Sequence, residues 1–411
     1  MPTNRACSVR ALAPCVVMSA LFGPASPALA QWTATSLHPS AALFSDGQGA
    51  GGAQQVGSVQ VGPTVGHTRA SLWSGTAGSW TNLHPGTGYS IAYATDGVQQ
   101  VGEVDPVGFP RAALWTGSAG SYIDLHPAPA FNSVALGVGG GQQVGYVVLG
   151  VYHASLWTGS VGSWVDLNPL PTNGYEHNSQ AFATDGTQQV GYVVDVGGVI
   201  SAALWSGTAA SWVNLHPPGA LSSYAYGVGG GRQVGMVQAT GSSPTNACLW
   251  SGTAGSIVNL NPAGSTNSRA MDILGTMQVG YADVGGVRRA SLWTGTAASW
   301  TDLSAVLPAA YVSSEARSIS TDGGFITVVG FAYNNTFQRS EAILWKRASP
   351  PPPCPADING DHTVNTSDLT ALLVRFGQSV PPGTQGDLNN DGIVNTLDLV
   401  QLLVQFGQVC P

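Results

Sequence analysis

One short pattern occurs seven times along the chain, and this repetition limits the available folds more than any other feature. The pairs Val-Gly and Leu-Trp both recur with a period of about 45 residues. A third pattern, Leu-His-Pro or Leu-Asn-Pro, follows Leu-Trp and degenerates to Leu-Ser-Ala at Leu303. The repeated pairs begin at Val56, Val101, Val144, Val190, Val234, Val279 and Val329, and at Leu72, Leu114, Leu156, Leu204, Leu249, Leu292 and Leu344.

Each repeat contains four short apolar runs. In residues 181–217 these runs are "AFAT", "QQVGYVV", "SAALW" and "SWVNL", separated by "DG", "DVGG" and "SGTAA". Such separators are typical of hairpin turns. Four antiparallel strands per repeat is the arrangement of a β-propeller blade, and a ring of blades buries the faces that one sheet leaves exposed. The sequence therefore predicts a mainly β chain that folds as a seven-bladed β-propeller over residues 31–345.

The two ends of this region divide one repeat between them. The last repeat stops after "ILW" at residues 343–345 and lacks its fourth strand. "WTATSLHP", at residues 32–39, supplies a fourth strand without the other three. We predict that these segments pair, so that the N-terminal strand closes the last blade and leaves no strand edge at the seam.

The composition excludes some partners. Charged residues make up only 8% of the chain, and the net charge is −8. A negative protein is poorly suited to phosphate backbones and anionic membrane surfaces. We therefore expect no nucleic-acid partner.

Residues 1–30 have the features of a signal peptide. Arg5 and Arg10 precede the apolar run "ALAPCVVMSALFG", and "ALA" at residues 28–30 is a suitable cleavage site near Ala30. The apolar run is too short to span a bilayer comfortably, and we expect no membrane span in the mature chain. The expectation is a secreted or cell-surface protein, with an uncleaved membrane anchor as the alternative.

The repeated side chains have a structural and a functional interpretation. The Trp residues suit packing between blades, or stacking on sugars. The histidines of Leu-His-Pro suit turns at strand ends, or a ring of metal ligands. The "TDG" aspartates suit hairpin turns, or acid–base catalysis. We expect the structural role in each case. The residues are His38, His84, His126 and His216, with Asn168 and Asn261 at the same position, and Asp96, Asp185 and Asp322.

Acids outside the repeat are better candidates for catalysis, because function in a ring of similar blades should break its symmetry. These are Glu103, Glu176 and Glu315. Nothing in the sequence places two of them together, and no nucleophile motif, phosphate loop or zinc spacing occurs in residues 31–345. Cys248 is expected to be a small buried residue. The sequence therefore favours a noncatalytic propeller, and we assign no catalytic residue.

The repeats resemble a known family. "HASLWTG" and "AFATDGTQQVGY" are similar to the HAF-type extracellular repeat, and the resemblance spans residues 32–345. His153 and Ala154 keep the first two letters of the family's core motif, where other repeats have "RAS", "RAA" or "SAA". The resemblance implies a repeat architecture and export, and it implies no activity.

The composition changes after a proline-rich linker at residues 346–355. Within residues 356–411, two runs of twelve residues concentrate carboxylates and amides at positions 1, 3, 5, 9 and 12. This is the ligand order of an EF-hand, in which the backbone carbonyl of position 7 completes the set. The expected ligands are Asp357, Asn359, Asp361, Thr363, Asn365 and Asp368, and Asp387, Asn389, Asp391, Ile393, Asn395 and Asp398.

Clustered carboxylates repel one another unless a cation lies among them, so we expect two calcium ions. Gly392 suits the sharp turn at position 6 of the second run, and His362 departs from it in the first. Each run precedes an amphipathic helix. The faces expected to be buried carry Leu369, Leu372, Leu373 and Phe376, and Leu399, Leu402, Leu403 and Phe406.

Two loop–helix units with Asp at position 12 resemble a type I dockerin over about residues 354–410. The resemblance implies docking to a cohesin on a scaffold or surface protein. It places the cohesin contacts at Thr366, Ser367, Thr396 and Leu397, of which Leu397 departs from the usual hydroxyl residue. Cys354 and Cys410 bracket the module, which suggests a disulfide in an exported protein, with two free thiols as the alternative.

The sequence thus predicts an exported protein whose propeller displays a binding surface and whose dockerin fixes it to a cohesin. A carbohydrate-active hydrolase or lyase, with a polysaccharide as partner, is one alternative. A structural surface protein is the other.

Overall fold

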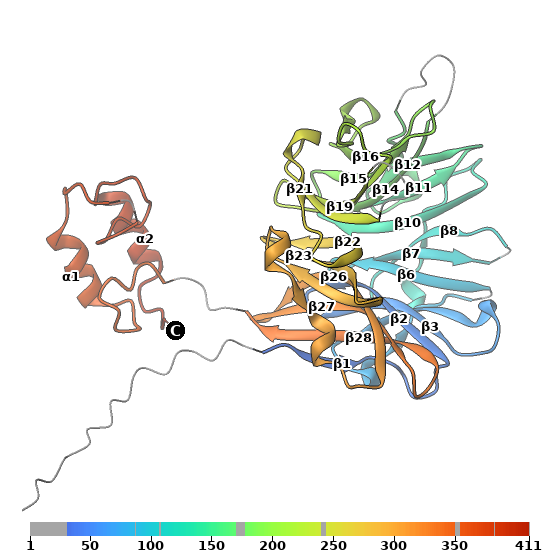
Figure 1. Cartoon of the computed structure of the whole chain (residues 1–411), viewed down its shortest axis with the longest axis horizontal. Helices are drawn as coiled ribbons and strands as arrows, with labels where there is room; N and C mark the ends of the chain where they lie inside the picture. Colours follow the sequence, from blue (N-terminus) through green and yellow to red (C-terminus); the bar gives the residue numbers. More distant parts are fainter. Residues whose placement is uncertain are drawn as a thin grey trace, which may run out of the picture.

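The computed structural model describes residues 31–86, 88–106, 108–169, 177–239, 244–349, 354–381 and 383–410. In these residues the chain is mainly β-strand, with two short α-helices near the C-terminus (Figure 1). The prediction of a mainly β chain is confirmed. The expected signal peptide, Glu176 and the prolines at 350–353 lie outside the described residues.

The described strands form repeated groups of four, paired antiparallel in chain order. The first three groups are β2 (Phe44–Gly51), β3 (Gln54–Gln60), β4 (Thr68–Trp73) and β5 (Thr81–Asn82); β6 (Tyr89–Thr95), β7 (Gln100–Asp105), β8 (Arg111–Trp115) and β9 (Ile123–Asp124); and β10 (Asn132–Gly139), β11 (Gln142–Val148), β12 (Tyr152–Trp157) and β13 (Val165–Asp166).

The next three groups follow the same order. They are β14 (Asn178–Thr184), β15 (Gln189–Val194), β16 (Ile200–Trp205) and β17 (Val213–Asn214); β18 (Ser222–Gly229), β19 (Arg232–Gln238), β20 (Thr245–Trp250) and β21 (Val258–Asn259); and β22 (Ser265–Leu274), β23 (Met277–Val284), β24 (Val287–Trp293) and β25 (Thr301–Asp302). A single parallel pair, Ile200 with Ser222, also joins β16 to β18.

The last group combines both ends of the β region. Its strands are β26 (Tyr311–Asp322), β27 (Phe325–Asn334), β28 (Arg339–Ala348) and β1 (Thr33–Ser36). β1 pairs antiparallel with β28 and sets Ala34 opposite Trp345, which is the pairing expected between residues 32–39 and 343–345. In Figure 1 the two strands lie side by side, in dark blue and orange. β28 continues through Ala348, past the start expected for the linker.

The tryptophans of the Leu-Trp pairs pack between neighbouring groups. Trp115 of the second group, for example, lies in one apolar cluster with Val56 and Leu72 of the first. Burying a large aromatic side chain stabilises the contact between two sheets. The seven equivalent residues are all fully buried: Trp73, Trp115, Trp157, Trp205, Trp250, Trp293 and Trp345.

A hydrogen-bonded serine joins each group to the next. Ser90 Oγ accepts the N–H of Ala70 at 2.9 Å and lies 2.9 Å from His84 Nδ1. Asn takes the place of His at two junctions, where Asn168 and Asn261 accept the serine hydroxyl. The Leu-His-Pro histidines therefore hold strand ends together. Each serine accepts an N–H across its junction: Ser45, Ser90, Ser133, Ser179, Ser223, Ser268 and Ser314.

The C-terminal part holds α1 (Thr366–Val374) and α2 (Thr396–Val404), each capped at its N-terminus by an asparagine side chain. Cys354 and Cys410 form a disulfide beside a small core that contains Leu372 and Leu402. The expected buried faces are only half correct. Leu369 and Leu399 pack against the core. Four other residues of the expected faces, at or just after the C-terminal ends of the helices, are exposed: Leu373, Phe376, Leu403 and Phe406.

Candidate functional site

The first strand of each group carries a β-bulge, at which its register against the second strand shifts by one residue. A bulge redirects a side chain and is common next to functional sites. The bulged residues are Gln48, Tyr93, Leu136, Phe182, Tyr226, Met271 and Arg317.

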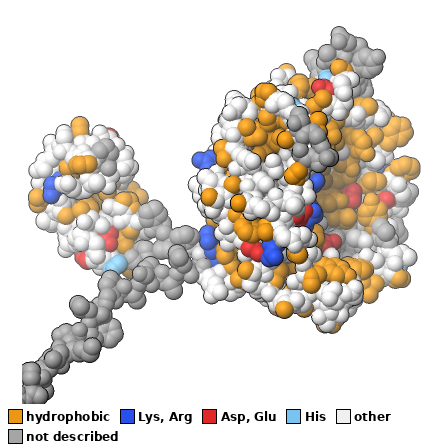
Figure 2. All heavy atoms as spheres, in the orientation of Figure 1, with side chains coloured by type: hydrophobic (Ala, Val, Ile, Leu, Met, Phe, Trp, Pro, Cys, Tyr) orange, Lys and Arg blue, Asp and Glu red, His pale blue; other side chains and the backbone are white. Residues whose placement is uncertain are grey.

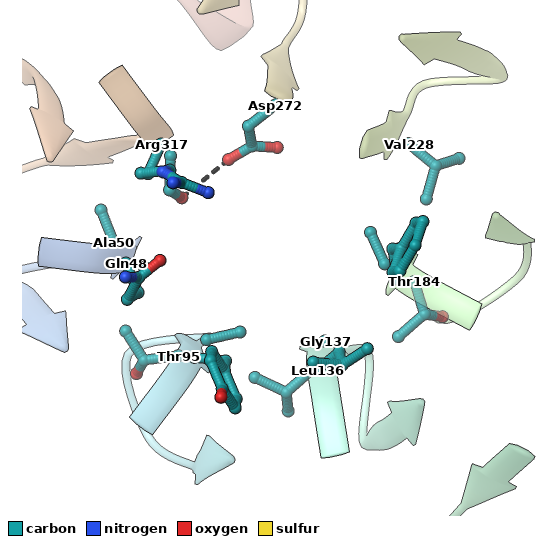
Figure 3. Close-up of a pocket in the computed structure, with 16 residues that line it drawn as sticks. Gln48, Ala50, Thr95, Leu136, Gly137, Thr184, Val228, Asp272 and Arg317 are labelled. Carbon is teal, nitrogen blue, oxygen red and sulfur yellow. Dashed lines mark hydrogen bonds between the residues drawn. The ribbon is translucent and has the colours of Figure 1, made fainter. Parts of the chain in front are cut away.

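These seven side chains, called here the bulge ring, enclose a cavity of about 290 Å³. A second cavity of about 170 Å³ is lined by Gln48 and by residues of the first strands of the six remaining groups. Figure 3 shows these strand segments arranged around a common open space, with Gln48, Leu136 and Arg317 facing it from different strands. First strands of all seven groups therefore line these two cavities, which we call together the channel.

Aromatic rings cover one part of the channel wall. Phe182 and Tyr226 of the bulge ring stack with centroids 5.3 Å apart. Tyr224 stacks on Tyr226 at 5.8 Å and meets Tyr192 edge-on at 5.2 Å. Aromatic contacts of this kind hold the rings in fixed orientations. Phe182 of β14 and Tyr226 of β18 thus form a rigid aromatic platform on the wall, and Tyr192 and Tyr224, which do not line the cavity, pack against it.

Acidic side chains contact two residues of the bulge ring without lining the cavity themselves. Tyr93 donates its hydroxyl to Glu103 at 2.9 Å, and burial raises the pKa of Glu103. Glu315 pairs with Arg288 at 3.1 Å and with Arg317 at 2.8 Å. Figure 2 shows a hollow in the β-sheet part where hydrophobic side chains gather around acidic ones. An acid without a basic partner, Glu103, therefore holds Tyr93, and an acid with two basic partners, Glu315, holds Arg317.

Asp272 is the one charged residue at its position, directly after the bulge, where the other first strands have Gly, Ala or Ser. Its carboxylate accepts the Ser318 hydroxyl at 2.7 Å and the Ile319 N–H at 2.9 Å, and Figure 3 marks the contact beside Arg317. Burial raises the pKa of Asp272. Asp272 is therefore the position at which the lining of the second cavity departs most from the repeat.

The sequence reasoning identified part of this site. Glu103 and Glu315, singled out because they lie outside the repeat, both contact bulge-ring residues. The "TDG" aspartates are turn residues, as expected: Asp96, for instance, accepts the N–H groups of Val98 and Gln99. The bulge ring itself was missed. Its signal is a column of dissimilar residues, eight positions before Val-Gly in the first six repeats, between small neighbours that do repeat.

The first acidic run of the C-terminal part gathers three carboxylates. One ligand atom from each of Asp357, Asp361 and Asp368 lies within 4.8 Å of the others. Asp368 is fully buried and accepts the N–H groups of Asn359 and Asn365. None of the ion pairs among the described residues includes one of these aspartates. The cluster is therefore a negative site without a basic partner.

The second acidic run has the same hydrogen bonds but a wider arrangement. Asp398 is fully buried and accepts the N–H groups of Asn389 and Asn395. In the part of the chain that the structure describes, the 4.8 Å clustering occurs in the first run alone. Position 6 has a positive φ in both runs, 68° at His362 and 82° at Gly392. The two runs therefore share one backbone design.

The expected cohesin contacts lie in the first turns of the two helices. Thr366 and Ser367 begin α1, Thr396 and Leu397 begin α2, and all four are exposed. Neither helix reaches the length or the apolar character that crossing a bilayer requires, and the other described residues form no such helix.

Comparisons with known proteins bear on the β-sheet part. No family model and no curated protein matches the chain. The β-propeller domain of the Trilobed protease from Pyrococcus furiosus is similar, with 9% identity, a TM-score of 0.51, and coverage of 74% of this chain and 95% of that domain.

Two further structures match more weakly. TolB from Acinetobacter baumannii has 10% identity and a TM-score of 0.39, over 72% of this chain and 65% of TolB. The acylaminoacyl peptidase of Pyrococcus horikoshii has 11% identity and a TM-score of 0.48, over 74% of this chain and 52% of the peptidase. This chain thus spans less than two thirds of either protein. The similarity to the Trilobed protease domain supports one conclusion: residues of the β-sheet part adopt a β-propeller-like fold.

Proposed function

We propose that the β-sheet part is a closed seven-bladed propeller of the HAF-type repeat. Two observations support it. The axial cavity is lined by the first strand of all seven groups. The junction between β28 and β2 also has the same hydrogen bonds as the others, because Ser45 accepts the Ala342 N–H at 2.9 Å and lies 2.8 Å from His38 Nδ1. A chain with open ends would not repeat this contact at its seam.

The acidic runs fit calcium. Their oxygen-rich residues suit a hard cation, and three carboxylates without a basic partner lie within 4.8 Å of one another. In the proposed sites the ions would be held by side-chain oxygens of positions 1, 3, 5, 9 and 12 and by the carbonyls of Thr363 and Ile393. Bound calcium would supply the positive charge that lets these carboxylates lie together. This chain's own residues hold the loops through the N–H bonds to Asp368 and Asp398.

The helical part is proposed to be a dockerin. Its two loop–helix units carry exposed apolar residues on both helices, including Leu373 at 50% exposure and Leu397 at 60%. An exposed apolar surface on a small unit is typical of a protein-interaction site. The proposed partner is a cohesin on a scaffold or surface protein, contacted by the first turns of α1 and α2.

The function that these features support best is calcium-dependent docking of an exported, noncatalytic propeller that displays a binding surface. The duplicated acidic loop carries this proposal. The enzyme alternative has less support, because both oxygens of Glu315 are held by arginines and Glu103 is held by Tyr93. The secreted or cell-surface location is part of the proposal.

Docking can be tested with the mature chain, residues 31–411, and a panel of immobilised type I cohesins. We expect capture by at least one cohesin in millimolar CaCl₂ and release by EGTA. An Asp357→Ala/Asp387→Ala variant should not be captured, whereas Asp195→Ala, an exposed turn residue of the propeller, should behave as the parent chain does. Capture that persists in EGTA would refute calcium-dependent docking.

A further inference from the structure

The channel wall combines three kinds of chemistry in one concave site. The bulge ring has an aromatic platform of Phe182 and Tyr226, and it has polar or charged groups on Gln48, Tyr93 and Arg317. Its two remaining members are aliphatic, Leu136 and Met271. The cavity of about 290 Å³ is close to the lower end of the range for small-molecule sites, about 300 Å³. The volume suits a ligand about as large as one or two sugar rings.

The residues of the bulge ring vary in size and chemistry, while their neighbours in the same strands stay small. Ala or Gly precedes each of the seven, and small residues follow nearly all of them. A position that served packing alone would repeat, as the buried Trp of each Leu-Trp pair does. Variation in residue type at seven positions that line one cavity indicates that these side chains together shape a binding site.

The charges of the wall exclude a strongly charged ligand. Arg317 lines the cavity, and Arg269 lies 6.0 Å from the centroid of the Tyr226 ring, so an organic cation would meet positive groups. Glu103 and Asp272 have no ion pair among the described residues, so an anion would meet negative ones. Both kinds of group can, however, exchange hydrogen bonds with hydroxyl groups.

We propose that the channel binds a neutral saccharide, with the aromatic platform against the apolar face of a sugar ring and with Gln48, Tyr93 and Arg317 bonded to its hydroxyls. Glu103 does not line the cavity and acts as a positioning residue that holds the Tyr93 hydroxyl. Aromatic faces suit the C–H face of a sugar, and the polar wall suits its many hydroxyl groups. This inference rests on the proposed binding role of the propeller. It adds the ligand class and the residues that recognise it.

The test uses isothermal titration calorimetry on the mature chain with cellohexaose, xylohexaose, mannohexaose and, as an anionic probe, trigalacturonate. We expect at least one neutral oligosaccharide to bind and trigalacturonate not to bind. Tyr226→Ala should weaken that binding by about tenfold, because it removes a stacking partner. Glu103→Gln, which keeps the side-chain shape, should weaken it by about fivefold, because it removes the charge-assisted hydrogen bond that orients the Tyr93 hydroxyl.

Phe325→Ala is the matched control, since it removes an exposed aromatic ring at the first residue of β27, outside the residues that line the channel cavities. Its affinity should equal that of the parent chain. Should Tyr226→Ala fail to fold, Glu103→Gln decides the question. No binding by any neutral probe, preference for trigalacturonate, or unchanged affinity in Glu103→Gln would overturn the proposal.

Cohesin capture, measured on the same samples, separates this inference from the docking role. Sugar binding without capture would remove the docking proposal and leave the saccharide site. Capture without binding of any neutral probe would remove the saccharide site and leave the docking role.

Discussion

A serine hydroxyl and an imidazole meet at junctions between neighbouring sheets. At three of them the imidazole Nε2 faces a carbonyl oxygen, 3.1 Å from Ala42 O at His38 and 3.2 Å from Ala130 O at His126 and from Ala220 O at His216. A carbonyl can only accept, so Nε2 carries the proton and Nδ1 accepts the serine hydroxyl. Burial lowers the pKa of His38 and of His126, which favours the neutral ring with this hydrogen-bond arrangement.

This arrangement predicts a loss of stability in acid. The pKa of His38 and of His126 in the folded chain lies below the ordinary value of about 6.5. The histidines of the unfolded chain therefore take up protons first as the pH falls, and the stabilisation that these side chains provide above a pH of about 6.5 is lost. The His38→Asn/His126→Asn variant should lose less stability between pH 7.5 and pH 5, by about 1 kcal/mol per site.

Asparagine is the matched replacement, since it already occupies this position at Asn168 and Asn261. Urea unfolding of both proteins at the two pH values measures the difference, and carboxylates elsewhere affect both equally. Identical pH dependence of the two proteins would contradict the assigned protonation state.

His362 and Gly392 predict opposite effects on the calcium loops. A non-glycine residue at positive φ costs roughly 1–2 kcal/mol, and both residues have that conformation. His362→Gly should therefore tighten calcium binding to the first loop by about fivefold, and Gly392→Ala should weaken the second by a similar factor. Calcium titration of each variant against the parent chain checks this. An affinity unchanged from the parent in both variants would show that the turn at position 6 is unimportant for calcium binding.

Among the elements, β1 lies furthest in sequence from its partner. Leu37 follows β1, is fully buried, and packs in one cluster with Trp73 and Leu344. Its N–H donates to Ala342 O at 2.8 Å, as the N–H of Leu83 donates to Ala70 O at 2.8 Å within the first group. The contact between β1 and β28 is thus built like the contact between the third and fourth strands of the first group.

The element scale gives a direct stability prediction. Leu37→Ala should lower the free energy of unfolding by about 2–5 kcal/mol, and Leu83→Ala by a similar amount, because both side chains are fully buried at equivalent positions. Leu43→Ala is the control, since that side chain is 44% exposed and should cost less than about 0.5 kcal/mol. A small loss in Leu37→Ala with a large loss in Leu83→Ala would show an open seam.

The sequence predicted the elements better than the cavity that they form. Strand runs, turns and the pairing of residues 32–39 follow from local patterns and period, which the repeat shows many times. The bulge at Tyr93 or Tyr226 depends on register between two strands, and its sequence signal appears only when the repeats are aligned and compared column by column. The exposure of Leu373 and Phe376 was also missed, because each helix of this small unit buries only a narrow face.

At the scale of the whole molecule, the two parts divide the proposed work. The β-sheet part contains the channel, whose bulge-ring wall carries six residue types at seven positions. The helical part carries duplicated acidic loops and exposed apolar helix positions, held together by the disulfide of Cys354 and Cys410. In the proposed function the first part binds and the second part anchors, and only the second depends on calcium.

A calorimetric calcium titration of the mature chain tests the central claim most directly. The account predicts uptake of about two ions per chain. It predicts about one in the Asp357→Ala variant and none once Asp387→Ala is added. Absence of calcium binding by the parent chain, or binding that both substitutions leave unchanged, would contradict it.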